Sequence, residues 1–342
     1  MAGRGLRRGP ESRTVAVLAR TLAIVAVLLL AASSRGAHAA TSTTTSATTS
    51  TTSSAAAKRP PGMSALEADT LLRSYAKDRA DTETWLKSSP TSYLATIQRR
   101  DFGNRASLTV GSDPGNDLRI EDPGVKPRHL RVTVEGDSFR VETLDRGARF
   151  KVKDVERASA TLPPTGISIG RFTLRLSHQR YPAIIVFDPK SPRFRLYKGV
   201  RYFPPDLAYH IVARLSPNQK PDTMIILSTR GNQRRAVRVG WFDFKVGGAA
   251  CHLEATRLLE PGVGEKDFGL YFTDATTGEE SYGVGRYLEA EPRKDGSYVL
   301  DFNRCYNPAC AYSEHYNCPI PPRGNRLGVA IRAGEMDSHY SH

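Results

Sequence analysis

Residues 301–335 constrain the fold more than any other part of the chain. They contain three of the four cysteines of the 342-residue sequence, together with many Asn and Tyr side chains and a proline-rich exit. Neither a regular helix nor a regular strand requires such a composition, because proline removes a backbone donor and Asn bonds to nearby backbone groups. The stretch is therefore predicted to form a fixed loop system.

The first 39 residues have the pattern of a secretory signal peptide. Five arginines precede an apolar run over residues 22–32, and Ala37 and Ala39 are small residues that suit signal peptidase. The run is shorter than the about 20 residues that cross a bilayer, which disfavours the alternative of a membrane anchor. We therefore expect export to the periplasm, the cell envelope or the extracellular space, with no stable membrane span after cleavage.

The basic charge of the chain is moderate once the signal peptide is removed. The sequence has 49 Lys and Arg against 35 Asp and Glu, and residues 1–40 contain six Arg and one Glu, so the remainder has a net charge of +9. Such an excess predicts a weak contact with anionic surfaces such as lipid head groups, or simply a solvated basic surface. Export and the shortness of the basic clusters disfavour nucleic acid as a partner.

Four cysteines in an exported chain predict disulfide bonds before metal ligands. Cys310 and Cys318 are close in sequence and are predicted to pair, which leaves Cys251 with Cys305. The alternative is a zinc site that adds His315 to the three cysteines of the loop, but its C-x4-C-x4-H-x2-C spacing is not a standard one. No metal and no cofactor are predicted.

Composition and periodicity divide the chain into six parts. These are a signal peptide over 1–39, a disordered Ser/Thr/Pro-rich linker over 40–62, a helical segment over 63–90, a first β domain over 91–180, a second β domain over 181–335, and a tail over 336–342. Ser64 and Glu67 form a capping box that predicts the start of the helix. Residues 180–182 are predicted to join the two β domains.

The helix is followed by many short segments with a β pattern. The apolar face predicted for the helix comprises Leu66, Leu71, Leu72, Tyr75 and Ala76. A hairpin is predicted around Gly136 and Asp137, and further strands at 172–176, 183–187, 193–197, 209–215, 224–229, 236–244, 252–258, 268–273 and 298–302. The predicted class is mainly β, with an N-terminal helical segment, a small sandwich, and a larger sandwich or barrel domain with a disulfide-stapled C-terminal loop.

The small sandwich has the motifs of a known family. They are Gly111, N-D-L-R-I at 116–120, His129, the turn at Gly147, and I-G-R at 169–171. With these motifs, residues 107–176 resemble a forkhead-associated (FHA) domain, a β-sandwich that usually binds phosphothreonine peptides. The resemblance implies the sandwich fold.

The phosphate-binding pattern of that family is altered in this chain. Ser112 stands where the family has its phosphate-binding Arg, and Lys126-Pro127 replace the usual Ser-Arg ahead of His129. Phosphopeptide binding is therefore not implied by the resemblance. Lys126 and Arg128 keep an anion site at this place open as an alternative.

A second resemblance covers most of the chain. The motifs are F-P-P-D at 203–206, D-A-T-T-G-E-E-S-Y-G-V-G-R-Y-L at 274–288, D-F-N-R at 301–304, Y-N-P at 306–308, C-P-I-P-P at 318–322, N-R-L at 325–327 and A-G-E at 333–335. With them the chain is similar to the bacterial and archaeal family catalogued as domain of unknown function 1684. The resemblance implies a fold and a cluster of residues, but no activity. Ser281 replaces a usual Thr, and Cys305 a usual Ala, which is consistent with Cys251–Cys305 being an additional bridge.

Two groups of polar residues are candidates for a ligand site. Arg286 follows Tyr282 in a glycine-rich turn, and its guanidinium offers a planar fork of donors to a carboxylate, a phosphate or a sugar. The loop adds amide and phenol groups at Asn303, Tyr306, Asn307 and Asn325. The alternatives are structural: Arg286 pairs with an internal acid such as Asp274 or Asp301, and the amides satisfy the loop backbone.

Three functions remain open from the sequence. We favour an exported binding or structural module for a polar ligand, a glycan or a peptide. The alternative is a hydrolase that uses two carboxylates, Asp274 or Asp301 together with Glu279, Glu280 or Glu335. A third possibility is an adaptor, which would need an open basic surface at Lys126 and Arg128. The H-E-x-x-H motif of metallohydrolases is absent.

Overall fold

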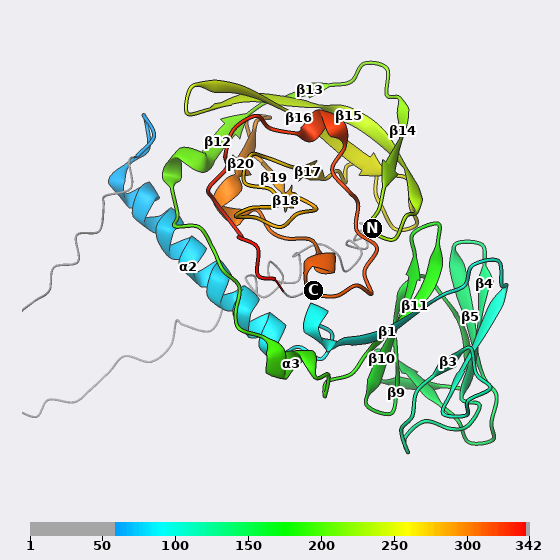
Figure 1. The fold of residues 1–342 in the computed structure, drawn as a ribbon. Helices are drawn as coiled ribbons and strands as arrows, with labels where there is room; N and C mark the ends of the chain where they lie inside the picture. Colours follow the sequence, from blue (N-terminus) through cyan, green and yellow to red (C-terminus); the bar gives the residue numbers. More distant parts are fainter. Residues whose placement is uncertain (1–58, 340–342) are drawn as a thin grey trace, which may run out of the picture.

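The computed structural model describes residues 59–339, which form a mainly β protein with one long helix (Figure 1). The predicted signal peptide, most of the linker and the end of the tail lie outside the described residues. In the described part of the chain, no helix is both long and apolar enough to cross a membrane.

The long helix, α2 (Ala65–Ser88), begins and ends where the sequence predicts. Its first turn has both bonds of the capping box, in which the Ser64 hydroxyl accepts from the Glu67 N–H and the Glu67 carboxylate accepts from the Ser64 N–H. The helix ends before Pro90, which cannot continue it.

The predicted apolar face of α2 is only partly correct. Ala68, Tyr75 and Leu86 are buried, whereas Leu66 is 72% exposed. Ala68 and Tyr75 pack with Leu71 and Leu72 around Leu207, whereas Leu66 lies outside this cluster. The later turns lie along the second β domain and bury their inner side.

Two sheets form the predicted small sandwich. One has the order β1-β11-β10-β9-β6-β7 and the other β3-β2-β4-β5-β8. Their apolar side chains enclose a single core between the sheets. The bounds are β1 (Thr96–Asp101), β2 (Ser107–Gly111), β3 (Leu118–Arg119), β4 (Leu130–Glu135), β5 (Ser138–Thr143), β6 (Phe150–Val152), β7 (Val155–Arg157), β8 (Ser159–Leu162), β9 (Thr165–Ile169), β10 (Phe172–His178) and β11 (Pro182–Phe187). The β4–β5 hairpin confirms the turn predicted at Gly136 and Asp137.

The joint between the two β domains lies later than predicted. Residues 179–181 form the turn of the β10–β11 hairpin, and Pro182 is the first residue of β11. Strand β11 pairs with β1 on its other side, so β11 belongs to the sandwich. Its side chains are buried on both faces. Ile184 and Val186 point into the sandwich core, while Ile185 and Phe187 pack against the second domain. Strand β11 therefore contributes side chains to the cores of both domains.

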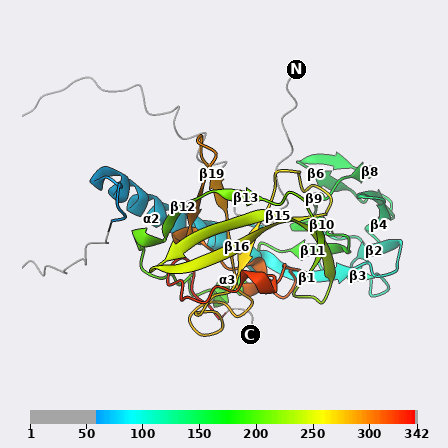
Figure 2. The same ribbon diagram turned by 90° about the horizontal axis from the view of Figure 1, so that it is seen from above.

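The second domain is built from short strands and one long hairpin, and Figure 2 shows it beside the sandwich. Its strands are β12 (His210–Ala213), β13 (Leu215–Pro217), β14 (Thr223–Leu227), β15 (Gln233–Val246), β16 (Ala249–Leu258), β17 (Leu270–Phe272), β18 (Arg286–Leu288), β19 (Ala290–Pro292) and β20 (Tyr298–Asp301). Strands β13 and β14 pair with one edge of β15, and β16 pairs with the other. The C-terminal loop is wound into the 3-10 turns η3 (Phe302–Arg304), η4 (Ala309–Ala311) and η5 (Arg323–Asn325), as expected for an irregular segment.

One predicted strand is a helical turn instead. Residues 193–197 alternate in polarity, but the structure has α3 (Arg193–Leu196) there. Ser191 precedes the turn, and its backbone oxygen and hydroxyl accept from the N–H groups of Phe194 and Arg193. Pro192 sets a helical φ of −63°. Local turn chemistry therefore outweighs the alternation.

Candidate functional site

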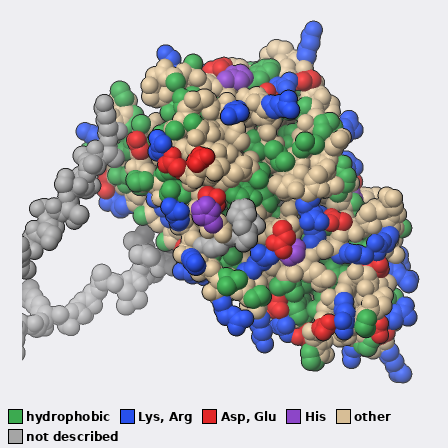
Figure 3. All heavy atoms as spheres, viewed as in Figure 1, with side chains coloured by type: hydrophobic (Ala, Val, Ile, Leu, Met, Phe, Trp, Pro, Cys, Tyr) green, Lys and Arg blue, Asp and Glu red, His purple; other side chains and the backbone are tan. Residues whose placement is uncertain are grey.

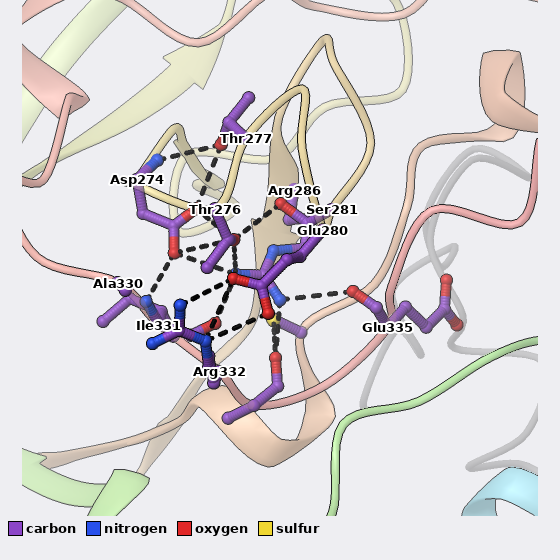
Figure 4. A network of polar contacts seen from close by, with 12 residues as sticks. Asp274, Thr276, Thr277, Glu280, Ser281, Arg286, Ala330, Ile331, Arg332 and Glu335 are labelled. Atoms are coloured by element: carbon purple, nitrogen blue, oxygen red, sulfur yellow. Dashed lines mark hydrogen bonds and ion pairs between the residues drawn. The ribbon is translucent and has the colours of Figure 1, made fainter.

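Arg286 is at the centre of a buried polar network (Figure 4). Its side chain is 0% exposed. The Nη1 atom donates to the backbone oxygens of Ala333 and Glu335 at 2.5 and 3.2 Å, and Nη2 donates to that of Ile331 at 2.7 Å. Nη2 also pairs with Asp274 Oδ2 at 3.1 Å. Three backbone oxygens of residues 331–335 thus accept hydrogen bonds from one guanidinium group.

Asp274 is satisfied from every side. Its Oδ1 accepts from the hydroxyls of Thr276 and Thr277 at 2.9 and 3.0 Å, and its Oδ2 accepts from the Ile331 N–H at 2.6 Å. Like Arg286, it has a side chain that is 0% exposed. A buried charge pair is tolerated only when hydrogen bonds replace the lost water, and this pair meets the condition.

The glycine-rich turn ahead of Arg286 brings the backbone close to its neighbours. Gly285 has a φ of +104°, and a Cβ at this position would lie 2.5 Å from Phe272 O and 2.8 Å from Pro321 Cγ. Only glycine fits there without strain. The turn therefore serves close packing and the placement of Arg286, which supports the structural interpretation of this motif.

The three candidate amides bond to the protein itself. Asn303 exchanges two hydrogen bonds with the backbone of Asp206, at 2.8 and 2.9 Å. Asn307 Nδ2 donates to Met336 O at 2.8 Å. Asn325 accepts from the N–H of Glu254 and donates to its carbonyl, at 2.7 and 3.0 Å. These side chains tie distant backbone segments together, as the structural alternative predicted.

The three candidate carboxylates lie in separate networks. Asp301 Oδ2 lies 3.1 Å from His210 Nδ1 and 3.3 Å from Arg304 Nε. Glu335 Oε2 accepts from the Asn307 N–H at 2.8 Å and from the Tyr312 hydroxyl at 3.1 Å. Asp274 is engaged with Arg286, as described above. All three are buried, and the geometry of two carboxylates facing one open cleft, which the hydrolase hypothesis needs, is not formed by these residues. Glu280, another candidate, forms an exposed ion pair with Arg332 at 2.8 Å.

Tyr282 and Tyr306 belong to an aromatic cluster between the domains. The ring of Tyr306 lies 5.9 Å from that of Tyr287, which in turn lies 4.6 Å from Tyr271. The Tyr306 hydroxyl donates to Glu289 at 3.0 Å, and burial together with this carboxylate raises the pKa of Tyr306 well above its usual value. Ligand binding at Tyr282 and Tyr306 stays a prediction.

The four cysteines are all buried. The Cys310 N–H donates to Cys318 Sγ at 3.3 Å, and Cys251 and Cys305 lie in one apolar core. Neither predicted disulfide bond is confirmed by these contacts, and both stay predictions. Within residues 59–339, no group of three or more His, Cys, Asp or Glu is arranged to hold a metal ion.

At one end of the sandwich, three loops are fastened together by hydrogen bonds. Asn116 Nδ2 donates to Pro127 O at 2.7 Å. The Arg128 N–H donates to Asp145 Oδ2 at 2.8 Å, and the Asp145 N–H donates to Arg128 O at 3.0 Å. Hydrogen bonds thus fix the relative positions of the loops at 112–117, 121–129 and 144–149.

These loops carry exposed cations, which we call the basic apex: Lys126, Arg128 and Arg146. In the described part of the chain, none of the three side chains forms an ion pair. His129 lies beneath them, buried, and its Nδ1 accepts from the Lys126 N–H at 3.0 Å. Figure 3 shows Lys and Arg side chains over the sandwich surface. Lys126 and Arg128 were predicted from the sequence and Arg146 was not, although the turn motif at Gly147 lies in the same loop as Arg146.

Comparisons with known proteins agree with the two resemblances. Residues 195–336 match the model of the family described as protein of unknown function (DUF1684), and residues 108–164 match the FHA domain model. A comparison with curated proteins found no match.

Several solved structures are similar to parts of the chain. An uncharacterized protein of Haloarcula marismortui, solved by NMR, is 35% identical with a TM-score of 0.36, covering 44% of this chain and 82% of that chain. The FHA domain of FhaA is 20% identical with a TM-score of 0.19, covering 26% of this chain and 85% of that one. Mycobacterium tuberculosis EmbR, solved with a low-affinity phosphopeptide, is 17% identical with a TM-score of 0.19, covering 34% of this chain and 31% of that one.

The fold and the buried network define a mainly β protein in which an FHA-like sandwich is joined to a second β domain through a shared strand. The chain belongs to the family described as protein of unknown function, DUF1684.

Proposed function

We propose that the protein is an exported binding module of the cell envelope, and that it takes an anionic peptide at the basic apex of its FHA-like sandwich. The observation that carries the proposal is the apex itself. Lys126, Arg128 and Arg146 are exposed, and among the described residues none of their side chains forms an ion pair. Unpaired surface cations on fixed loops attract an anionic partner and are already in position to bind it.

A peptide is favoured over a glycan by the type of fold. The FHA family usually binds phosphothreonine peptides through the same loops, and residues 108–164 match its model. Ser112 replaces the phosphate-binding Arg of the family, so the phosphate would be held by Lys126 and Arg128 instead. The DUF1684 domain would act as a rigid support, because its Arg286 network is fully buried.

Fluorescence anisotropy with two peptide pools tests this proposal. The pools are degenerate peptides that contain phosphothreonine and the same peptides with unmodified threonine. We expect binding of the phosphorylated pool only, weakened at least about ten-fold by K126A/R128A, since each lost bond to a charged group costs about 1.5–3 kcal/mol.

The matched control is K151A/K153A, which removes two exposed lysines of the same sandwich. Lys153 lies in the β6–β7 turn, away from the loops of the apex. If both double variants weakened peptide binding equally, net charge alone would explain the binding, which would contradict the proposal. So would preference for an acidic polysaccharide such as alginate over both peptide pools.

A further inference from the structure

A groove of about 400 Å³ lies where the end of α2, the segment after β11 and α3 meet. Its lining is Lys87, Ser88, Pro90, Pro189, Lys190, Ser191, Phe194 and Arg195. Phe194 is half-buried and forms an apolar floor, and the prolines on two sides restrict the backbone of the rim. The groove is on the molecule's surface and separate from the basic apex.

The rim of the groove is basic. Lys190 and Arg195 are exposed, and within residues 59–339 neither side chain forms an ion pair. Lys87 Nζ forms an ion pair with Glu83 Oε1 at 2.9 Å. The nearby acid, Asp188, is held by Arg171 Nε at 3.0 Å. Two cations at the groove therefore remain available for an anion, and Lys and Arg side chains gather at the surface around α3 in Figure 3.

An apolar side chain stands beside these cations. Leu196, the last residue of α3, is 70% exposed. Leu196 directly follows Arg195. Arg193, at the start of α3, forms an ion pair with Glu314 at 2.7 Å, which holds the turn in place. An exposed leucine next to cations suits a membrane surface, where cations meet lipid phosphates and an apolar group enters the acyl boundary.

We propose that the groove and α3 together form a contact site for an anionic membrane surface. A phosphate head group enters the groove between Lys190 and Arg195, and Leu196 inserts beside it. The membrane is favoured over a soluble polyanion because a polyanion gives no reason for the exposed leucine. The site shares no residue with the basic apex, so variants of each site test the two proposals separately.

Vesicle co-sedimentation of the full chain tests the site. We expect binding to vesicles of phosphatidylcholine with phosphatidylglycerol, and much weaker binding to phosphatidylcholine alone. Each cation near an anionic surface contributes about a five-fold factor, so K190Q/R195Q should weaken binding about 25-fold. L196S should weaken it about five-fold, because the polar side chain loses the transfer to the apolar boundary.

The control K220Q/K294Q removes two exposed lysines elsewhere and should leave binding unchanged. All these variants change exposed side chains, so folding is expected to be unaffected. Equal weakening by the two double variants would overturn the proposal, since net charge would then explain the binding. Equal binding to both kinds of vesicle would overturn it as well. So would binding of soluble polyphosphate, without vesicle binding, that only K190Q/R195Q weakens.

Discussion

Arg286 joins the chemistry of one residue to the stability of the whole C-terminal segment. Its guanidinium bonds to three backbone oxygens of residues 331–335 and to the Asp274 carboxylate, all without solvent. Removing such a cation leaves a buried carboxylate and three carbonyls without their donor. The cost of an uncompensated buried charge far exceeds that of breaking an exposed pair.

Replacing Arg286 by methionine should therefore lower the free energy of unfolding by about 3–5 kcal/mol. Urea unfolding followed by circular dichroism measures this change. R332Q is the matched control, because it breaks the exposed pair with Glu280 and should cost less than about 1 kcal/mol. An R286M protein as stable as wild type would mean that Arg286 is not a structural residue.

Asp301 predicts a pH dependence with a definite sign. Burial acts to raise the pKa of its carboxyl, but the hydrogen bonds and charge of His210, together with the hydrogen bond from Asn303, outweigh burial and hold the pKa below its usual value. The folded pKa is thus lower than the unfolded value of about 3.9. The stabilisation from ionised Asp301 is present above that value and is lost as the pH falls through the folded pKa.

D301N should therefore be less stable than wild type at neutral pH, and the difference should shrink at acidic pH. Urea midpoints measured from neutral pH down to about pH 3 check this expectation. A difference between the two proteins that stays constant over this range would show that ionisation of Asp301 does not contribute.

At the scale of elements, β11 couples the two domains. Ile184 and Phe187 have side chains on opposite faces of the strand and belong to different cores. Unfolding of one core should destabilise the other core as well, because side chains of β11 belong to both. The sandwich and the DUF1684 domain should therefore unfold together.

The substitutions I184A and F187A test this coupling. Each should cost about 2–5 kcal/mol through lost burial and a cavity. Each should also shift a single calorimetric transition. V155A, on the exposed edge strand β7, should change stability by less than about 0.5 kcal/mol. Two separate transitions, of which each variant shifts only one, would contradict the shared-strand interpretation.

The elements that could be predicted from the sequence are those fixed by local chemistry. The capping box at Ser64 and Glu67 and the hairpin at Gly136 act within a few residues, and both are confirmed. The alternation at residues 193–197 predicted a strand wrongly, because Ser191 and Pro192 start a helical turn there. The burial of β11 on two faces depends on a domain that lies far along the chain.

The candidate site was predictable to a similar extent. Pairing of Arg286 with Asp274 was one of the stated alternatives, and it is correct. The acceptors at residues 331–335 were not predictable, because 45 or more residues separate them from Arg286. The apex likewise depends on Arg146 meeting the loop of Lys126, which only the folded sandwich brings about.

At the scale of the whole molecule, the basic apex and the buried Arg286 network lie in different domains. The second domain encloses its charges at Arg286, Asp274 and Glu335, and the sandwich exposes unpaired cations at one end. Ligand binding should therefore affect the loops of the basic apex and leave the residues around Arg286 unchanged.

Amide hydrogen exchange, with and without the phosphothreonine peptides that the wild-type protein selects, tests whether the ligand binds at the basic apex. We expect slower exchange on binding in the loops at 112–117, 121–129 and 144–149, and no change at residues 274–286 or 331–335. Slower exchange around Tyr282 and Tyr306 with no change in the apex loops would contradict it.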